Sequence, residues 1–599
     1  MRSPARVLNS LTKHSQTTEY RFERLYRILF NEEMYYLAYQ RIYAKPGNMT
    51  QGADGETIDR MSLPRIEKLI LSLKDESYSP QPSRRVHIPK KNGKTRPLGV
   101  PSFDDKLVQE VVRMVLEAIY EGHFEDTSHG FRPHRSCHTA LNAVQKTFTG
   151  KKWFIEGDIK GFFDNVNHDI LIDILKERIS DERSIRLIRK FLRAGYLEQW
   201  RFHGTYSGMP QGGIISPILA NIYLDKLDKY MKEYAAGFDR GNRVRAYREY
   251  EVLTYQKRLV MRELKTATNN VERKVLVKRL KEIDKTRSAM PCFDPMDGNF
   301  KRLKYVRYAD DFLIGIIVSK VKIKDDIKRF LADRLALELS DEKTLVTHTE
   351  KPAKFLGYEV TVRKSNLQKR NKRGSLSRVY GNKVRLKVTT EVIKKKLLEL
   401  GVLKFSYHNG HEQWIPKHRS ELINNDDLEI LDSYNAEIRG FYNYYSIANN
   451  ASELNTFHYI MQYSMYKTFA GKYRTTVRRI CQKYKRNGVF TVGYTVKNGQ
   501  VKERRLYNEG FKRKRPSYDR LIDRCPNPMP GVSTTSLIDR LKARKCELCG
   551  ATDNLVMHHV RKLGELKGKE NWEKLMIARR RKAMAVCGSC HQKIHHGTF

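Results

Sequence analysis

Long hydrophobic runs are missing from this chain of 599 residues. Phe312–Val318 is one of the longest apolar stretches, and it is far shorter than the roughly 20 residues a membrane-spanning helix needs. The first 30 residues also lack the apolar segment of a secretory signal peptide. These absences exclude an integral membrane protein and predict a basic N-terminal arm rather than a leader.

Acidic residues are few relative to basic ones. The chain has 68 Asp and Glu against 114 Lys and Arg, which gives a net charge of +46. Such an excess predicts a polyanionic partner, and nucleic acid is favoured because phosphate neutralisation supplies affinity for any sequence. Residues 361–599 carry about +29 of this charge, so we expect the C-terminal part to bind nucleic acid more strongly.

Cysteine is also sparse, with eight in the chain. Four of them form two Cys-x-x-Cys pairs near the C-terminus: Cys546 with Cys549, and Cys587 with Cys590. This spacing predicts a structural zinc site and argues against a disulfide framework. A phosphate-binding loop ending at Thr95 is excluded, because Ile88 stands where that motif requires glycine.

The pattern along the chain predicts five regions. Residues 1–80 are expected to be mostly helical, with apolar spacing typical of helices over Glu19–Tyr43 and Leu63–Lys74, and residues 81–360 to mix strands and helices. Within the second region, residues 238–295 contain a charged insertion that predicts an exposed helical hairpin in contact with RNA. A helical, aromatic-rich region, a basic linker and a Cys/His-rich module follow at 361–485, 486–535 and 536–599.

Acidic residues interrupt two apolar strand-like runs. Asp310 and Asp311 separate two such runs, which predicts a β-hairpin with carboxylates at its tip, although an exposed acidic turn would give the same pattern. Asp158 ends another apolar strand, and Asp164 is expected to begin the next helix. Asp158, Asp310 and Asp311 together would supply the carboxylates of a two-metal phosphoryl-transfer site.

The order of several segments resembles the successive sequence blocks of reverse transcriptases, above all those encoded by group II introns. The segments are "IPKKNGKTRPLGVPSFDDKLVQ", "FIEGDIKGFFDNVNH", "GMPQGGIISPILANIYLDKLD", "YADD", "DEKTLV" and "KFLGY". The resemblance implies an α+β multidomain fold with a right-hand fingers–palm over 81–360, extended by residues 1–80, and an α-helical thumb or maturase domain over 361–485.

The same resemblance implies roles for single residues. Asp158, Asp310, Asp311 and the backbone carbonyl of Ile159 would hold two Mg²⁺ ions. The deoxynucleoside triphosphate would contact Lys90, Arg96, Gln211 and Lys343. Phe163 would exclude the ribose 2′-hydroxyl, although one ring of the Phe162–Phe163 pair is expected to serve only core packing. The aromatic residues around Arg439 could stack on bases or pack the helical core.

The last region resembles an HNH endonuclease, a small zinc-stabilised ββα domain. The resemblance implies that His559 is the general base and that His558, His591 and His595 are ligands of a catalytic metal, expected to be Mg²⁺. The usual middle Asn is not at its family position, and Asn571 is the nearest candidate. A zinc-stabilised DNA-binding tail without cutting activity is the alternative.

Together these features predict a group II intron-encoded protein. It would copy RNA into DNA, assist intron splicing, nick target DNA and use the cut end as a primer, within a ribonucleoprotein that contains the intron RNA. We expect a bacterial, nucleoid-associated cytoplasmic protein. A splicing maturase or a non-mobile reverse transcriptase without nuclease activity is the alternative.

Overall fold

A computed structural model describes most of the chain. The described residues are 3–43, 47–89, 95–198, 201–294, 297–317, 321–363, 368–370, 376–378, 382–495, 500–517, 537–579 and 581–598. Lys90 and residues 518–535 of the predicted linker lie outside them. Among the described helices, none combines the length and the apolar character that crossing a membrane requires.

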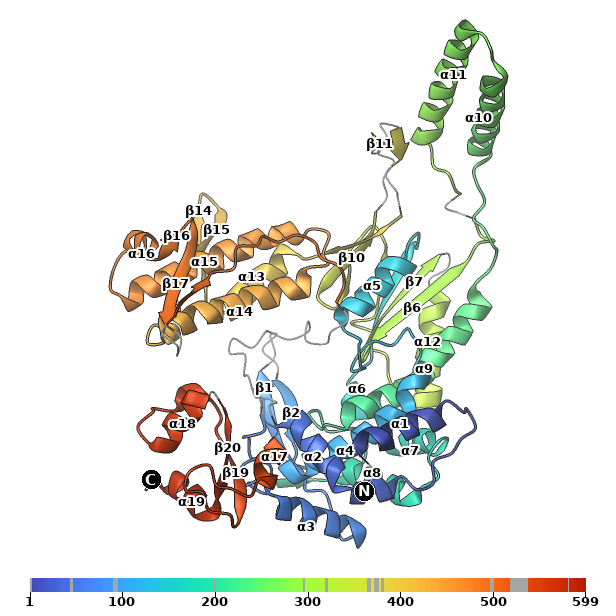
Figure 1. Ribbon diagram of the computed structural model, residues 1–599. Helices are drawn as coiled ribbons and strands as arrows, with labels where there is room; N and C mark the ends of the chain where they lie inside the picture. Colours follow the sequence, from blue (N-terminus) through green and yellow to red (C-terminus); the bar gives the residue numbers. More distant parts are fainter. Residues whose placement is uncertain are drawn as a thin grey trace.

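A four-stranded antiparallel sheet, the central sheet, forms the middle of the molecule (Figure 1). Its strands are ordered β6-β7-β3-β8, with bounds Arg302–Tyr308, Asp311–Ile317, Trp153–Asp158 and Leu345–His348. The helices α5 (Cys137–Thr147) and α9 (Ser216–Phe238) pack on β6, and α12 (Val321–Leu335) packs on α9. β7 is buried along most of its length, which explains its unbroken apolar run.

Two residues, Ala309 and Asp310, join β6 to β7, so the predicted hairpin is confirmed. Ala309 has a φ of 56°, a left-handed conformation that is unusual for a residue other than glycine. Gly130 lies directly against this turn, since a Cβ atom there would stand 2.3 Å from the Ala309 nitrogen. A side chain at position 130 would therefore push the carboxylate turn out of position.

The guanidinium of Arg307 is fully buried and holds the same turn through hydrogen bonds. It donates to Asp228 Oδ1 at 2.8 Å, to the Ala309 carbonyl at 2.8 Å and to Ser128 Oγ at 2.7 Å. A further bond reaches Asn221 at 3.2 Å. Burial is the largest single effect on the pKa of Arg307 and lowers it, but the charge and hydrogen bonding of Asp228, together with smaller effects of Tyr305 and Asp225, raise the pKa overall. This buried ion pair connects the end of β6 to α9.

Helices and a small sheet make up the N-terminal region. Its helices α1, α2, α3 and α4 span Pro4–Ser15, Glu32–Ile42, Leu63–Lys74 and Phe103–Tyr120. The predicted helix over Glu19–Tyr43 is interrupted, because the Asn31 side chain caps α2 by accepting from the Glu33 amide. A sheet of order β2-β1-β4-β5 follows, with bounds Thr95–Val100, Ser83–Pro89, Tyr196–Glu198 and Arg201–His203.

Short helices connect these parts. They are α6 (Phe162–Asn165), α7 (His168–Lys176) and α8 (Glu182–Arg193). Asp164 lies in the first turn of α6, where the sequence predicts it.

The region after the central sheet is built on helices α13 to α16, with bounds Thr390–Glu399, Asp427–Tyr445, Leu454–Lys472 and Val477–Tyr484. Strands β9, β10 and β13 form one sheet at its start, with bounds Ala353–Phe355, Tyr358–Val362 and Val384–Lys387. Hairpins β11–β12 (Gln368–Arg370, Leu376–Arg378) and β14–β15 (Leu403–His408, His411–Pro416) complete it.

The helical region extends past its predicted end at residue 485. Strands β16, β17 and β18 (Lys485–Arg486, Val489–Thr495, Val501–Arg505) pair with one another. Phe490, Tyr507 and Phe511 are buried in the same core as the helices, so the described residues 486–495 and 500–517 pack with them rather than forming a separate linker. Tyr434, Phe441, Tyr442 and Tyr445 are also buried there, which favours core packing over base stacking.

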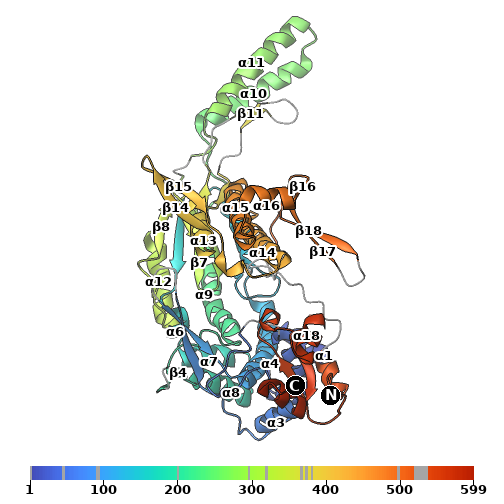
Figure 2. The same ribbon diagram turned by 90° about the vertical axis from the view of Figure 1, so that its left-hand side faces the viewer.

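The charged insertion forms the predicted helical hairpin. Its helices α10 (Arg248–Thr266) and α11 (Asn270–Ala289) project from the body of the molecule in both views, with β11 near their base (Figures 1 and 2). A small core of Val260, Leu276 and Ile283 joins them.

The C-terminal module contains α17 (Leu537–Lys542), β19 (Leu555–His559), α18 (Asn571–Arg579), β20 (Ala583–Cys587) and α19 (Gly588–His596). β19 and β20 are antiparallel and α19 packs on both, which gives the predicted ββα unit. The module lies against the N-terminal helices (Figure 1). Met61 and Met557 form an antiparallel bridge between the two parts, and both are fully buried.

The Arg307–Asp228 pair gives a stability prediction. We expect Arg307→Met to lower the free energy of unfolding by about 3–5 kcal/mol, because Asp228 would remain buried without its cation. Denaturant titration would measure the loss, and Arg307→Met combined with Asp228→Leu should recover part of it. Lys304→Met, at a half-exposed position of the same strand, is the control and should cost at most about 1 kcal/mol. A double variant as unstable as Arg307→Met alone would contradict this account.

Candidate functional sites

The three predicted carboxylates lie at one end of the central sheet. Asp158 is the last residue of β3 and Asp311 the first of β7, and the two are paired directly across the strands. Asp310 occupies the adjoining turn. Lys343, from the segment before β8, donates from Nζ to Asp158 Oδ2 at 2.8 Å. Four residues from three separate segments of the sequence therefore meet at one site.

Negative charge accumulates at this strand end. Desolvation raises the pKa of Asp310, and the neighbouring Asp158 raises it further. The pKa of Asp311 is raised to about 7, first by desolvation and then by the charges of Asp310 and Asp158. The hydrogen bond to Asp158 raises the pKa of Lys343. Crowded carboxylates of this kind are stabilised by cations, so the donor set fits divalent metal binding.

The backbone of Ile159 is oriented toward the same site. Ile159 forms an antiparallel bridge with Leu339, and the two bonds of this bridge are made by the Asp158 carbonyl and the Lys160 amide. In such a pair the central residue directs its own backbone groups away from its partner. The Ile159 carbonyl therefore faces the β7 side of β3, where Asp311 lies.

Two predicted nucleotide contacts meet at the edge of the N-terminal sheet. The Nε of Arg96, in β2, donates to Gln211 Oε1 at 2.7 Å. The charge of Arg96 lowers the pKa of Asp310, against the larger raising effect of desolvation. Arg96 is exposed, and both groups remain accessible to a ligand.

The two phenylalanines of α6 differ in burial. Phe162 is buried in the core, whereas Phe163 is only partly buried. Their rings meet edge to face with centroids 5.2 Å apart. The Phe163 carbonyl accepts from the Met209 amide at 2.6 Å, which ties this turn to the segment that carries Gln211. Phe162 therefore has the packing role that the sequence predicts for one of the pair.

The four predicted zinc ligands meet in the C-terminal module. The sulfur atoms of Cys546, Cys549, Cys587 and Cys590 all lie within 4.8 Å of one another. The Cys549 and Cys587 sulfurs are 3.6 Å apart. This is too far for a disulfide and close to the ~3.8 Å between two thiolates bound to one tetrahedral zinc ion. Four thiolates in this arrangement fit zinc.

A second cluster joins three predicted ligands to a residue that sequence reasoning missed. His558, His591 and His595 lie with Asp59, their ligand atoms all within 4.8 Å of one another. The Nε2 atoms of His591 and His595 are 3.0 and 2.9 Å from Asp59 Oδ2. Although burial raises the pKa of Asp59, the hydrogen bond from His591 keeps it below its ordinary value.

His559 lies on the other side of the same strand. Consecutive residues of a strand point to opposite faces, so His558 faces the cluster and His559 faces the N-terminal helices. The Nε2 of His559 is 3.2 Å from the hydroxyl of Tyr39, which is fully buried. Burial lowers the pKa of His559 to about 4. Asn571 is exposed at the start of α18.

Two important residues had no recognisable signal in the sequence. Arg307 precedes the acidic turn in an ordinary strand pattern, and only the fold reveals its buried partner Asp228. Asp59 lies in the predicted helical extension, far along the chain from the histidines. Long-range contacts of this kind leave no periodicity to detect.

Three family models match separate parts of the chain. Residues 88–255 match reverse transcriptase (RNA-dependent DNA polymerase), and residues 382–515 match type II intron maturase. Residues 546–591 match the AI2M/AI1M-like HNH endonuclease. The first match contains β3 of the central sheet and ends within α10, before β6, β7 and β8. The other two coincide with the helical region and the C-terminal module.

Curated relatives match over most or all of the chain. The group II intron-encoded protein LtrA of Lactococcus lactis subsp. cremoris is 43% identical over 606 residues, covering 100% of both chains. A putative COX1/OXI3 intron 1 protein of Saccharomyces cerevisiae is 34% identical, over 96% of this chain and 69% of its own. An uncharacterized 91 kDa protein in a cob intron of Schizosaccharomyces pombe is also 34% identical, over 95% and 69%.

The identity over the full length, the three family matches and the carboxylates at the strand ends agree. The chain belongs to the group II intron-encoded proteins, and it is a multifunctional RNA-directed DNA polymerase, intron maturase and HNH DNA endonuclease that drives intron retrohoming by target-primed reverse transcription.

Proposed function

We propose that the reverse transcriptase site is the strand end that carries Asp158, Asp310 and Asp311, at the palm of a right-hand polymerase. The direct pairing of Asp158 with Asp311, beside the turn that holds Asp310, is the observation that carries this proposal. These carboxylates and the Ile159 carbonyl would hold two Mg²⁺ ions, and the bound metal would help to activate a primer 3′-hydroxyl and to stabilise the departing pyrophosphate.

The surrounding residues would bind and orient the nucleotide. Arg96, held by Gln211, is an exposed cation near Asp310 and suits the triphosphate. Lys343, which donates a hydrogen bond to Asp158, would donate a proton to the leaving group. Phe163 presents an apolar ring that would clash with a ribose 2′-hydroxyl and could not hydrogen-bond it. Lys90 keeps its expected role as a second triphosphate contact.

We further propose that the helical region is the thumb and that its partner is intron RNA, with target DNA bound by the endonuclease module. The strongly basic composition of residues 361–599 supports this. The module would hold structural zinc at its four cysteines. At the histidine cluster, three imidazoles and a carboxylate suit a transition metal better than the Mg²⁺ expected from the sequence. A bacterial cytoplasmic, nucleoid-associated location remains our proposal.

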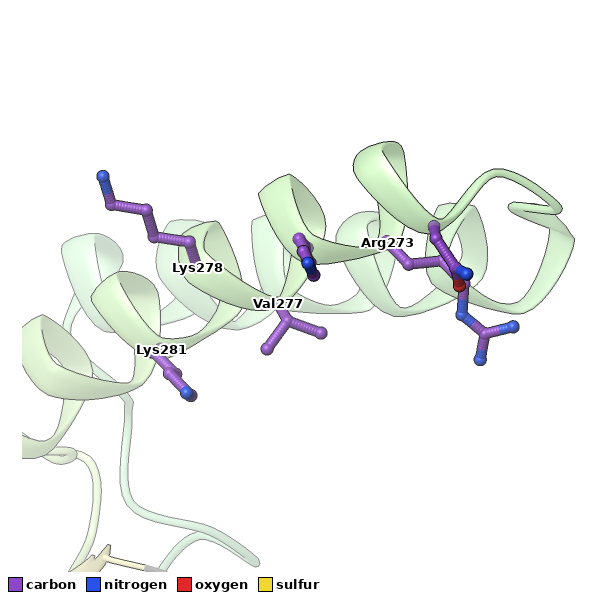
Figure 3. Close-up of a pocket in the computed structure, with 6 residues that line it drawn as sticks. Arg273, Val277, Lys278 and Lys281 are labelled. Carbon is purple, nitrogen blue, oxygen red and sulfur yellow. The ribbon is translucent and has the colours of Figure 1, made fainter.

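The insertion hairpin is proposed as an additional RNA contact. One face of α11 carries Arg273, Lys274, Lys278 and Lys281, at helical spacing and without an acidic residue among them. Figure 3 shows the labelled basic side chains extending from this helix into open space. A solvated helix face would normally mix both signs of charge, so this face suits an RNA backbone.

The polymerase assignment predicts a sharp effect of Asp310→Ala. Primer extension on an RNA template with Mg²⁺ and deoxynucleotides should fall about a thousandfold or more, because metal binding contributes several kcal/mol of transition-state stabilisation. Asp164→Asn, in the first turn of α6, is the matched control and should retain extension. Full activity in Asp310→Ala would contradict the proposed site.

Nucleotide selectivity tests Phe163 separately. Phe163→Ala should raise ribonucleotide incorporation relative to deoxynucleotide incorporation about tenfold or more. A steric clash that adds about 1.4 kcal/mol to the activation free energy slows incorporation tenfold, and the substitution would remove this clash. Competition between the two nucleotides in primer extension would measure this ratio. Phe162→Leu should lower stability and leave the ratio unchanged, since Phe162 is buried. An unchanged ratio in Phe163→Ala would remove the proposed gate.

The hairpin proposal predicts a change in salt dependence. Replacing Lys274, Lys278 and Lys281 with Gln should weaken binding to intron RNA and reduce the slope of log affinity against log salt by about 2. Lys13, Lys68 and Lys74, exposed on α1 and α3, allow a control with the same loss of charge. Equal effects of the two triple substitutions would show a general charge effect and contradict a contact at the hairpin.

A further inference from the structure

Asp59 is an unexpected member of the histidine cluster. It comes from the N-terminal extension, between a loop and α3, whereas His558, His591 and His595 belong to the endonuclease module. Its Oδ2 lies within hydrogen-bonding distance of both helix histidines, and its Oδ1 accepts from the His559 amide at 2.8 Å. One carboxylate therefore contacts both structural elements that form the metal site.

The ring of His558 shows that this cluster is built for a ligand. His558 is buried to 3% exposure, and neither of its ring nitrogens has a hydrogen-bond partner among the described residues. Its Nδ1 is 3.6 Å from Asp59 Oδ1, longer than a hydrogen bond. A buried imidazole without a partner is costly unless it coordinates a cation.

The contacts around the cluster fix Asp59 in this position. The Met557 amide donates to the Met61 carbonyl at 2.8 Å, and the Arg60 amide donates to the Met557 carbonyl at 3.2 Å. Lys542 of the module also pairs with Glu33 of α2 at 3.3 Å. The bridge between Met61 and Met557 lies close to Asp59 in the chain. Backbone hydrogen bonds and packing therefore fix the position of the Asp59 carboxylate.

This arrangement is incompatible with cutting DNA. Catalytic metal sites keep one coordination position open for water or substrate, and three histidines leave a fourth position in a tetrahedral site. The Asp59 carboxylate is an anion, as is the phosphate of the DNA backbone, so the two would compete for this fourth position. In addition, His559 forms a hydrogen bond with Tyr39 and is buried against the N-terminal region, so its side chain cannot reach a substrate.

We propose that Asp59 is the fourth ligand of the metal held by His558, His591 and His595, and that its carboxylate occupies the position a DNA phosphate must take before the module can cut. The inference rests on the proposed role of the three histidines as ligands. It joins the polymerase part of the chain to the endonuclease part through one metal ion, and it keeps the endonuclease closed until the module is displaced.

An adjoining cavity provides a route for the exchange. It has a volume of about 560 Å³ and is bordered by Asp59, by His595 and by three arginines, Arg60, Arg84 and Arg561. His595 is the most exposed of the three histidines, with 45% of its side chain accessible. A phosphate entering this basic cavity would approach the metal position from the side of His595 and compete with Asp59.

The ligand role is tested by metal binding rather than by activity. Mn²⁺ would be titrated into the full-length protein with zinc in its thiolate site, in an Asp310→Asn background that weakens the polymerase site, and followed by electron paramagnetic resonance. Asp59→Asn should lower the affinity of the histidine site at least tenfold. Glu56→Gln removes a half-exposed carboxylate from the same loop and should leave the affinity unchanged. An unchanged affinity in Asp59→Asn would overturn the proposal.

The closed state is tested by hydrogen exchange and by nicking. The Met557 amide should exchange at least tenfold faster in Asp59→Asn than in the Glu56→Gln control. At saturating Mn²⁺, nicking of target DNA should rise several-fold in Asp59→Asn and also in Tyr39→Phe, which frees His559. Asp59→Glu keeps the charge and should show an intermediate Mn²⁺ affinity, which guards against a general folding defect.

The outcomes separate the two parts of the inference. A fall in nicking by Asp59→Asn at saturating Mn²⁺ would make Asp59 part of the cutting machinery and overturn the closed state. If neither the wild type nor the variant nicks DNA, the module has no endonuclease activity in this assay, and the proposed closed state is overturned as well. The Mn²⁺ titration would still decide whether Asp59 is a ligand.

Discussion

The buried ion pair between Arg307 and Asp228 is the constraint on which the acidic turn of the proposed polymerase site depends. Asp310 and Asp311 carry like charges at a tight turn, where repulsion and desolvation oppose the folded geometry. Arg307 holds that turn through the Ala309 carbonyl and anchors it to α9. Because a buried cation must satisfy all its donors, its five hydrogen-bonding positions fix the turn in one orientation.

The polymerase and the endonuclease share one hydrophobic core on the N-terminal side. Met557, Leu541 and Ala585 of the module are buried in the same cluster as Tyr39 and Met61. The other side of the module has a small core of its own around the four cysteines. A module of this size needs such support, because few apolar side chains are available to it and a metal or a neighbouring surface must replace them.

Charge and shape are divided between the parts of the molecule. The ends of β3 and β7 concentrate negative charge, while the insertion hairpin and residues 361–599 carry most of the net positive charge. The hairpin reaches away from the body (Figure 2), and it has a small core of its own. Cutting and copying require the same DNA end, so a contact between the two active parts allows one to control the other.

The sequence alone determined the local features: the β-hairpin with its acidic tip, the Cys-x-x-Cys pairs, the helical insertion, α3 over Leu63–Lys74 and the family. Each depends on residues close together in the chain, where periodicity and spacing carry the information. Only the tertiary structure decided that Phe162 is the buried ring, that residues 486–495 and 500–517 pack with the helical region, that Arg307 meets Asp228 and that Asp59 meets three histidines. These contacts join residues far apart in sequence, and they arise from packing and from the need to pair buried charges, which no local pattern records.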